Sequence, residues 1–475
     1  MVYWLKLRVI LTKENDLNVF IKELFMKKIN LLDNRIYRNL VMMSIPIMTT
    51  SFIQMSYTLM DTFWVGKLGT EAIAGVGIVA FIMWFANSLV LVSKTGIEIG
   101  VAYSVGSRDY KQFRKYIDTS VAINLFMSIT FGIILYIFRL DIIKFFNIKS
   151  EMVNSLANSY LKIVLLGLPF TFLNPLFSGV FNGSGNSKVP FIANSIGLII
   201  NIVLDPILIY GFFGLPEFGV KGAAIATTLS QIIVTVIFMV FSILDGRILK
   251  GINLVKNFNN PTFKEVLRLG VPTAFKSCIF AFISTILLRI IANWGENAVA
   301  AENVAVQIEA INWMTVEGFS IALCALIAQN YGAKNYENIA SGYKKGLRII
   351  LGIGVFCSFF LFFSSDYIIK LFIRDDLNTI RMGVSYLKVL AFSEIFLALE
   401  IGISGMFNGL KNTKTPTVIS TFSNALRIPL AYLVFYLKLD IAYIWAVISF
   451  CTFLKGILNY IFFKKFIREN FDFKL

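Results

Sequence analysis

Residues 178–183 read Ser-Gly-Val-Phe-Asn-Gly, and residues 404–409 repeat them almost unchanged as Ser-Gly-Met-Phe-Asn-Gly. The second stretch begins 226 positions after the first. The same offset places Ser159-Tyr160-Leu161-Lys162 on Ser385-Tyr386-Leu387-Lys388, and it places Asn186, Lys188 and Pro190 on Asn412, Lys414 and Pro416. One offset that holds over so long a stretch indicates an internal duplication, so the chain consists of two homologous halves.

Both halves consist mainly of apolar runs. Hydrophobic residues fill 57% of the 475 positions, charged residues fill 15%, and the mean hydropathy is +0.74. A soluble chain of this length needs far more polar residues to cover its surface. Apolar runs of about 20 residues recur, for example at 117–138 and 189–213, without strand-like alternation. We therefore expect an all-α integral membrane protein whose twelve transmembrane helices form two six-helix lobes.

An even number of helices in each lobe lets both lobes begin on the same side of the membrane, which defines a parallel repeat. The predicted segments are an N-terminal cytoplasmic segment at 1–39, a first lobe at 40–244, a cytoplasmic linker at 245–263, a second lobe at 264–463 and a cytoplasmic tail at 464–475. Residues 1–25 lack the pattern of a signal peptide. We interpret them as an extension ahead of a native start at Met26, or alternatively as a cytoplasmic or interfacial helix.

The net charge of +16 reflects loops rather than a nucleic-acid surface. Lys and Arg are in excess in the loops on the side of the N-terminus, and such an excess marks the cytoplasmic side. Both termini are therefore expected to be cytoplasmic. The chain has no histidine, and its four cysteines are widely spaced within apolar runs, which favours neither a metal cluster nor a disulfide framework.

Ionisable residues inside apolar runs are costly and are therefore candidates for function. Asp61 has no basic residue at helical spacing, although it could also cap a helix at the interface. Asn201 and Asp205 are four residues apart and share one helix face. Pro206 frees a backbone carbonyl beside them. These hard oxygen ligands suit Na⁺ or a proton, unless Asp205 lies near the helix exit and faces water.

The second half holds further ionisable residues within apolar runs. Glu309 and Glu400 either line a substrate cavity or pair with Lys276 and Arg427. Lys276 and Gln54 are further candidates for the cavity lining. At the repeat offset, Leu287, Arg427 and Ala431 stand where the first half has Asp61, Asn201 and Asp205. We therefore expect two lobes that are alike in fold and different in chemistry.

Several of these stretches, in their order, resemble the MATE (multidrug and toxic compound extrusion) family. They are Ser44-Ile45-Pro46, residues 61–66, 72–77 and 106–110, Phe181-Asn182-Gly183 through Pro190, Asp205-Pro206, residues 222–227 and residues 329–332. The resemblance covers roughly residues 36–465. It implies a V-shaped twelve-helix fold that exports organic cations in exchange for Na⁺ or H⁺. It also implies a coupling site at Asp61, Asn201, Asp205 and Thr227.

Family members of the NorM-like branch have a second acidic site on helices seven and ten. Phe280 and Leu397 occupy those positions here, with Lys276 and Glu400 nearby. The chain therefore looks closer to the DinF-like or broader bacterial branch. The resemblance further implies a monomer in the bacterial cytoplasmic (inner) membrane, surrounded by lipid. It implies no cofactor and no metal beyond Na⁺ at Asp61, Asn201 and Asp205.

Two other functions are alternatives. A flippase for lipid-linked oligosaccharides belongs to the same superfamily, and Lys94, Lys276 and Arg427 are compatible with an anionic cargo. An integral-membrane enzyme such as a lipid transferase would need a catalytic constellation, and the sequence shows none. The expected function is therefore secondary active efflux of cationic amphiphiles, without enzymatic activity.

Overall fold

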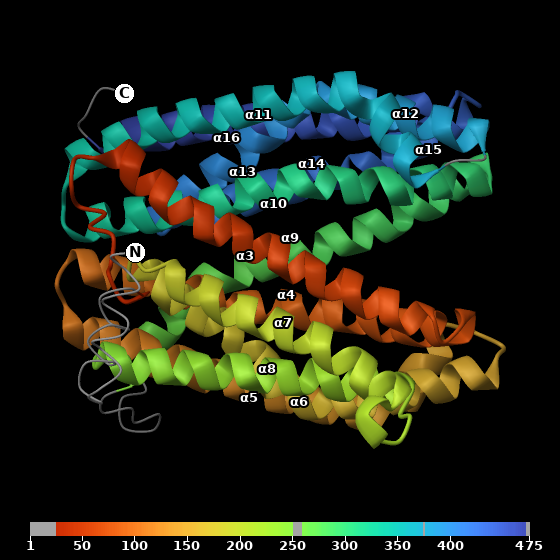
Figure 1. Cartoon of the computed structure of the whole chain (residues 1–475). Coiled ribbons are helices and arrows are strands. Elements are labelled where there is room, and N and C mark those ends of the chain that lie inside the picture. Colours follow the sequence, from red (N-terminus) through yellow and green to blue (C-terminus); the bar gives the residue numbers. More distant parts are fainter. Residues whose placement is uncertain (1–24, 250–258, 374–375, 472–475) are drawn as a thin grey trace, which may run out of the picture. The chain divides into compact units, whose positions relative to one another are not determined.

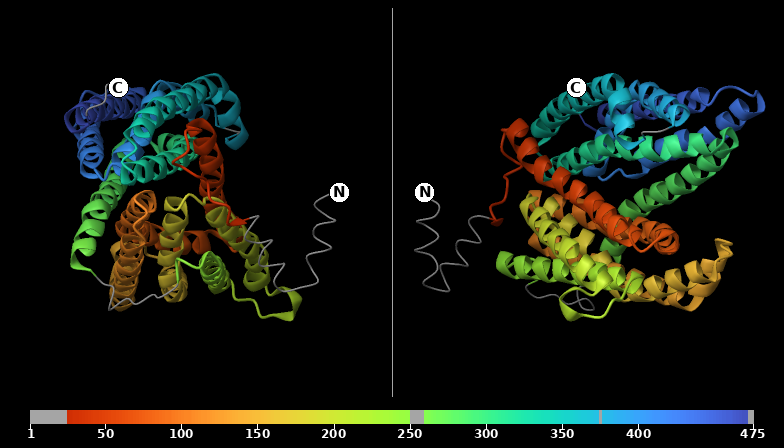
Figure 2. Two further views of the ribbon diagram at one scale, coloured as in Figure 1. Left: turned by 90° about the vertical axis from the view of Figure 1, so that its left-hand side faces the viewer. Right: turned by 45° about the vertical axis from the view of Figure 1, so that its right-hand side comes forward.

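The computed structural model describes residues 25–249, 259–373 and 376–471 (Figure 1). Within these ranges every regular element is a helix, as the two further views in Figure 2 also show. The α-helices in chain order are α3 (Ile36–Gly66), α4 (Thr70–Gly106), α5 (Tyr110–Phe145), α6 (Glu151–Gly183), α7 (Lys188–Tyr210), α8 (Val220–Asp245), α9 (Asn260–Ile291), α10 (Glu296–Gly332), α11 (Tyr336–Phe372), α12 (Leu377–Ala391), α13 (Glu394–Gly409), α14 (Lys414–Ala425), α15 (Arg427–Tyr436) and α16 (Ala442–Asn470).

Most of these helices are long and apolar enough to cross a membrane. Among the described residues there are 11 such spans, or 12 if the bent pair α12 and α13 counts as one. The all-helical, multi-span fold class is thereby confirmed. Residues 1–24 and 250–258 lie outside the described ranges, so the expectations for the N-terminal extension and for most of the linker stay predictions.

The chain forms two compact units. Unit 1 comprises Met1–Asn30 and Thr49–Leu267, and unit 2 comprises Leu31–Met48 and Arg268–Leu475. The first half of α3 therefore groups with unit 2, whereas the predicted boundary placed residues 40–48 in the first lobe. The reason is local: the amides of Asn330 and Asn338 donate to the carbonyls of Leu31 and Leu32, and Gly318 lies against Met48.

The duplication read from the sequence recurs in the helix ends. Adding the offset of 226 to Thr70–Gly106 gives residues 296–332, which are the ends of α10. In the same way α6 corresponds to α12 together with α13, and α7 corresponds to α14 together with α15. The N-caps also match, because Asp109 accepts a hydrogen bond from the amide of Gln112 and Asn335 accepts one from the amide of Asn338.

Two helices that are continuous in unit 1 are broken in unit 2. The equivalent of α6 bends by 54° between α12 and α13, where the backbone N–H and the hydroxyl of Ser393 both donate to the Leu390 carbonyl. The equivalent of α7 is interrupted at Leu426. Pro429 explains the second break, because it cannot donate a hydrogen bond to the carbonyl of Ala425.

Close helix packing is equivalent in the two units. A methyl group added to Gly183 of α6 would lie 2.6 Å from the carbonyl oxygen of Glu98 on α4. At the equivalent place, a methyl group on Gly409 of α13 would lie 2.8 Å from the carbonyl oxygen of Cys324 on α10. These glycines let the helix backbones approach closely, as small residues commonly do inside membranes.

A second helix contact occurs at equivalent positions in both units, but the large and the small residue are on opposite helices. On α4 a methyl group at Gly100 would lie 2.3 Å from the ring of Tyr116 on α5. The equivalent positions in unit 2 are Leu326 on α10 and Gly342 on α11, where a methyl group at Gly342 would lie 2.8 Å from the Leu326 side chain. Each unit therefore places one large and one small residue at this crossing, which conserves volume.

We predict that Gly100→Leu lowers the free energy of unfolding by about 1–3 kcal/mol, because the new side chain overlaps the ring of Tyr116. The loss should be smaller in a Tyr116→Gly background, which copies the arrangement of unit 2. The measurement is the melting temperature of the detergent-purified protein. Gly77→Leu is the control, since a methyl group at Gly77 meets nothing within 4 Å. Equal losses in both backgrounds would contradict the paired arrangement.

Candidate functional site

Two carboxyl groups that are distant in the sequence meet inside unit 1. Asp61 lies in the second half of α3 and Asp205 lies in α7. Their side chains are electrostatic neighbours. Asp205 is completely buried and Asp61 is partly buried. Two carboxyl groups in such proximity cannot both keep a full negative charge at low cost, so they favour a shared proton or a shared cation.

The face of α7 that carries Asp205 is built by spacing. Gly197, Asn201 and Asp205 follow one another at intervals of four residues and therefore share a face. The Asn201 amide donates to the Asp205 carboxylate over 3.3 Å. A methyl group at Gly197 would lie 2.3 Å from the hydroxyl oxygen of Tyr57, so glycine there lets the Tyr57 ring of α3 approach α7.

Thr227 reaches the same cluster from α8. Its hydroxyl lies 3.3 Å from Asp61 Oδ2 and 3.0 Å from the carbonyl oxygen of Ala223, one turn earlier in its own helix. Tyr160 of α6 is a further neighbour of Thr227 and of both aspartates. The structure thus brings together all four residues expected for cation coupling, Asp61, Asn201, Asp205 and Thr227, and adds Tyr57 and Tyr160.

Several oxygen atoms of this cluster lack a donor. Asp61 Oδ1, Asn201 Oδ1, Asp205 Oδ2 and the Tyr57 hydroxyl are buried and make no hydrogen bond within the described residues. Buried polar atoms in folded proteins are nearly always paired, so such a group indicates a missing ligand. Carboxylate, amide and hydroxyl oxygens suit a hard cation or a proton. No group of three His, Cys, Asp or Glu residues able to hold a metal ion occurs in the described ranges.

The end of α7 is fastened to the end of α3 beside the cluster. The Tyr210 hydroxyl donates to the Trp64 carbonyl over 2.7 Å, and the two rings meet edge to face with their centroids 6.2 Å apart. Trp64 follows Asp61 by three residues, and Tyr210 follows Asp205 by five. The contact therefore holds together the two helices that supply the carboxylates.

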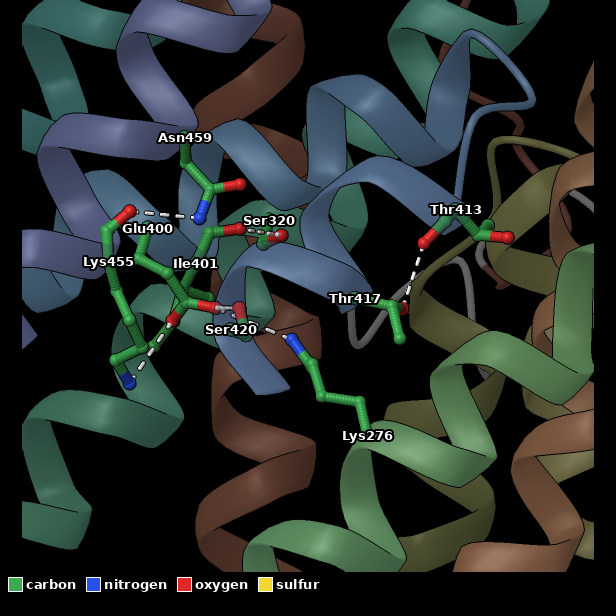
Figure 3. A network of polar contacts seen from close by, with 9 residues as sticks. All are labelled: Lys276, Ser320, Glu400, Ile401, Thr413, Thr417, Ser420, Lys455 and Asn459. Atoms are coloured by element: carbon green, nitrogen blue, oxygen red, sulfur yellow. Dashed lines mark hydrogen bonds and ion pairs between the residues drawn. The ribbon is translucent and has the colours of Figure 1, made fainter. Parts of the chain in front are cut away.

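In unit 2, Glu400 of α13 and Lys276 of α9 form an ion pair (Figure 3). Glu400 Oε1 lies 3.5 Å from Lys276 Nζ and accepts a hydrogen bond of 2.6 Å from the Ser420 hydroxyl. Glu400 Oε2 lies 4.0 Å from Nζ of Lys455 on α16. Of the two interpretations made for Glu400, the structure shows the ion pair with Lys276.

The other cavity candidates lie elsewhere. Glu309 of α10 accepts a hydrogen bond of 2.9 Å from the Tyr386 hydroxyl. Glu394 accepts a hydrogen bond from the Asn312 amide. Gln54 is an exposed residue of α3, in unit 1. The four cavity candidates therefore divide into the pair Lys276–Glu400 and two separate positions.

The carboxylate cluster is not duplicated in unit 2. Leu287 and Ala431, which are equivalent to Asp61 and Asp205, belong to the apolar core of that unit. Arg427, which is equivalent to Asn201, donates to the Thr452 hydroxyl over 3.0 Å. The tyrosine of the repeated Ser-Tyr-Leu-Lys block keeps a similar place, because Tyr160 and Tyr386 each neighbour a carboxyl group.

Sequence reasoning missed Tyr57, Tyr160 and Lys455 as members of these clusters. Lys455 had a usable signal, since a lysine in the middle of the last apolar run is costly in a membrane. Tyr160 also had one, because it belongs to a repeated block. Tyr57 had none, because its place depends on how closely α3 approaches Gly197.

Comparisons with known proteins agree on one family. The MatE family model matches residues 46–207 and 272–433, and the ends of the two matches are again 226 residues apart. The probable multidrug resistance protein NorM of Thermotoga maritima is 27% identical over 86% of this chain and 88% of its own length. YoeA of Bacillus subtilis, also named a probable multidrug resistance protein, is 26% identical over 86% and 89%.

Among solved structures, a MOP superfamily transporter from Pyrococcus furiosus matches with a TM-score of 0.84 and 23% identity, over 93% of this chain and 98% of its own. This likeness supports the two-unit fold. The expected placement in a DinF-like branch is not supported, because the relative from Thermotoga maritima is named NorM.

We predict that Thr227→Val weakens binding of Na⁺ or H⁺ at the cluster about two- to tenfold, because Asp61 loses one hydroxyl contact. A ligand that binds only the folded protein raises its melting temperature. The melting temperature of the purified protein is therefore measured against NaCl concentration, balanced with choline chloride, and against pH. Thr62→Val is the control, because the Thr62 hydroxyl donates only to the Thr58 carbonyl of its own helix. If Thr227→Val leaves unchanged the NaCl concentration and the pH at which half of the melting-temperature change has occurred, the role of this hydroxyl is contradicted.

Proposed function

The chain belongs to the MatE family, the MATE family of membrane transporters, and on this basis we propose that it is a secondary active multidrug efflux antiporter. Its cargo would be cationic or amphiphilic organic compounds, and its driving ion would be Na⁺ or H⁺. The names of the relatives from Thermotoga maritima and Bacillus subtilis, both multidrug resistance proteins, support this cargo class.

One observation supports the antiport mechanism above all others: unit 1 buries two neighbouring carboxyl groups beside oxygen atoms that have no donor. Such a group is stable in the membrane only when a proton or cation neutralises part of its charge. Unit 1 is therefore expected to be stable with its driving ion bound and less stable without it. A transporter needs this difference in order to couple ion binding to conformation.

The cycle follows from this difference. On the outer side, Na⁺ or H⁺ neutralises the carboxyl pair of Asp61 and Asp205. Neutralisation relieves their repulsion and lets α3 or α7 bend, which releases the substrate. On the inner side, loss of the ion restores a negative cluster that attracts the next organic cation. Coupling of this kind is reciprocal, so the substrate must weaken ion binding as much as the ion weakens substrate binding.

The remaining expectations belong to the same proposal. The protein would act as a monomer in the bacterial cytoplasmic membrane, with both termini in the cytoplasm, where the excess of basic loop residues lies. No cofactor beyond the driving ion is needed. A flippase of the same superfamily is less favoured, because Lys276 and Lys455 of unit 2 both lie within 4.0 Å of the Glu400 carboxylate, which offsets their positive charge.

The side of the membrane on which the C-terminus lies can be measured with reporter fusions. A green fluorescent protein fused after Leu475 should fluoresce, because it folds in the cytoplasm, and alkaline phosphatase fused there should be inactive. The reverse pair of results would place the C-terminus outside and would contradict the charge argument.

The coupling site has a direct test. We expect Asp61→Asn and Asp205→Asn each to lower ion-driven efflux of a fluorescent organic cation at least tenfold in proteoliposomes, because an amide cannot exchange a proton and binds Na⁺ weakly. Na⁺ and pH gradients are imposed separately, which also identifies the ion. Asp366→Asn is the control, because Asp366 is exposed on α11 and pairs with Lys370 of its own helix.

Full efflux in both aspartate variants would refute the coupling site. Absence of efflux by the unmodified protein under either gradient, with binding of a lipid-linked oligosaccharide instead, would favour the flippase.

A further inference from the structure

Helix α11, which runs along the edge of unit 2, has an exposed face that changes from basic to apolar along its length (Figure 1). The residues of this face follow one another at intervals of three or four, namely Lys344, Arg348, Gly352, Val355, Phe359 and Phe363. All six are exposed. The face therefore begins with positive charge and continues as a surface for hydrocarbon.

The charged residues of α11 indicate where the membrane boundaries lie. No charged residue occurs from 349 to 365. In an α-helix this stretch is about 25 Å long, close to the hydrocarbon core of about 30 Å. Asp366 and Lys370 form an ion pair just beyond its far end, so the charges there offset each other. Lys344 and Arg348 lie at the near end, which places them at the level of the lipid headgroups.

A third basic residue belongs to the same turn of α11. Lys345 follows Lys344, and its ammonium nitrogen lies 5.6 Å from the centroid of the Tyr37 ring on α3. Tyrosine rings are frequent at the boundary between membrane and water. We call Lys344, Lys345 and Arg348 the basic cluster. Among the described residues, none of the three forms an ion pair.

The acidic residues near this end of unit 2 do not offset the basic cluster. Asp33 pairs with Arg35 before α3, and Glu469 pairs with Lys465 near the end of α16. Glu337 is exposed on α11, about two turns nearer the start of the helix and therefore farther toward the water. Within the described part of unit 2, the basic cluster thus offers three positive charges to a group from outside.

The apolar part of the face has an opening directly beside the basic cluster. A methyl group at Gly352 would meet nothing within 4 Å. Beyond it, the rings of Phe356 and Phe360 stack on each other, and so do those of Phe359 and Phe363. Stacked rings present a flat apolar surface along the helix. An acyl chain can lie in the opening and along these rings.

We propose that the basic cluster and the apolar face beyond it form a binding site for an anionic phospholipid. The phosphate meets the basic cluster, and an acyl chain lies along Gly352 and Phe359. Charge complementarity selects this occupant, because basic residues at a helix end attract anionic headgroups. Scattered loop lysines would be enough to orient the chain in the membrane. Here the charges gather on one exposed face that continues into an apolar surface. In the orientation proposed above, the lipid belongs to the inner leaflet.

The site is tested by titrating phosphatidylglycerol into detergent micelles of the purified protein, with phosphatidylcholine keeping the total lipid constant. A lipid that binds only the folded protein raises its melting temperature. We expect the triple variant Lys344→Gln, Lys345→Gln and Arg348→Gln to need roughly tenfold more phosphatidylglycerol for half of that rise, because each basic residue near the surface adds to the attraction. The melting temperature without phosphatidylglycerol shows that the variant is folded.

A matched triple variant is the control. Lys111→Gln, Lys188→Gln and Lys414→Gln remove the same charge at exposed positions near the starts of α5, α7 and α14, and should leave the titration unchanged. The double variant Lys344→Arg and Lys345→Arg keeps the charge of the cluster and should preserve the response.

The apolar part of the site has its own variant. Gly352→Leu fills the opening without changing any charge, and it should raise the amount of phosphatidylglycerol needed. Sodium phosphate replaces the lipid in a parallel titration and should not reproduce the stabilisation, because it has no acyl chain.

Equal losses in the two triple variants would reduce the effect to net charge and would overturn the proposal. Stabilisation by sodium phosphate that only the cluster variant loses would show a site for a free anion and would also overturn it. So would a dimer, detected by light scattering, that Gly352→Leu abolishes, since a second copy would then cover the face. The titration needs neither an ion gradient nor a substrate, so its failure is distinct from a failure of antiport.

Discussion

A lipid bilayer offers the peptide backbone no hydrogen-bond partner, and the rest of this structure follows from that constraint. Every regular element in the described ranges is a helix, because a helix satisfies its own backbone groups. Helix breaks therefore require local compensation. At the bend between α12 and α13 the Ser393 hydroxyl and amide both meet the Leu390 carbonyl, and at Leu426 the chain resumes a helix at the next residue.

The same constraint makes buried polar side chains costly unless they have a partner. Each unit collects its buried charges in its own interior, but the two collections are unlike. Unit 1 gathers Asp61 and Asp205 with oxygen atoms that lack donors, so it needs a proton or a cation. Unit 2 places lysines around Glu400 and an arginine near Glu309, so these two carboxyl groups have counter-charges within the chain. The two units therefore share their helix packing, whereas different residues at equivalent positions give them different buried polar groups.

Much of the fold could be predicted from the sequence because it depends on repeated local patterns. The offset of 226 predicted where α4 and α10 begin and end relative to one another, since glycines and caps recur with it. The break at Leu426 was also readable in principle from Pro429. The bend at Ser393 was not, because no proline or glycine lies between α12 and α13 to mark it.

The candidate site was predictable in part. The interval of four residues between Asn201 and Asp205 fixed their common face, whereas the approach of Asp61 and Thr227 came only from the family resemblance. The contact of Tyr57 with Gly197 and the position of Lys455 beside Glu400 depend on which helices pack together. Periodicity within one helix contains no information of that kind, so these residues became visible only in three dimensions.

We propose that ion coupling belongs to unit 1 alone. Its most direct test is the ratio of driving ions to substrate, measured as the membrane potential at which net transport in proteoliposomes reverses. We expect the same ratio for the unmodified protein and for a variant with Glu302→Gln and Glu394→Gln, two buried carboxyl groups of unit 2 without a cationic neighbour among the described residues. A ratio lower by one ion in that variant would show that unit 2 also binds a coupling ion and would contradict coupling by unit 1 alone.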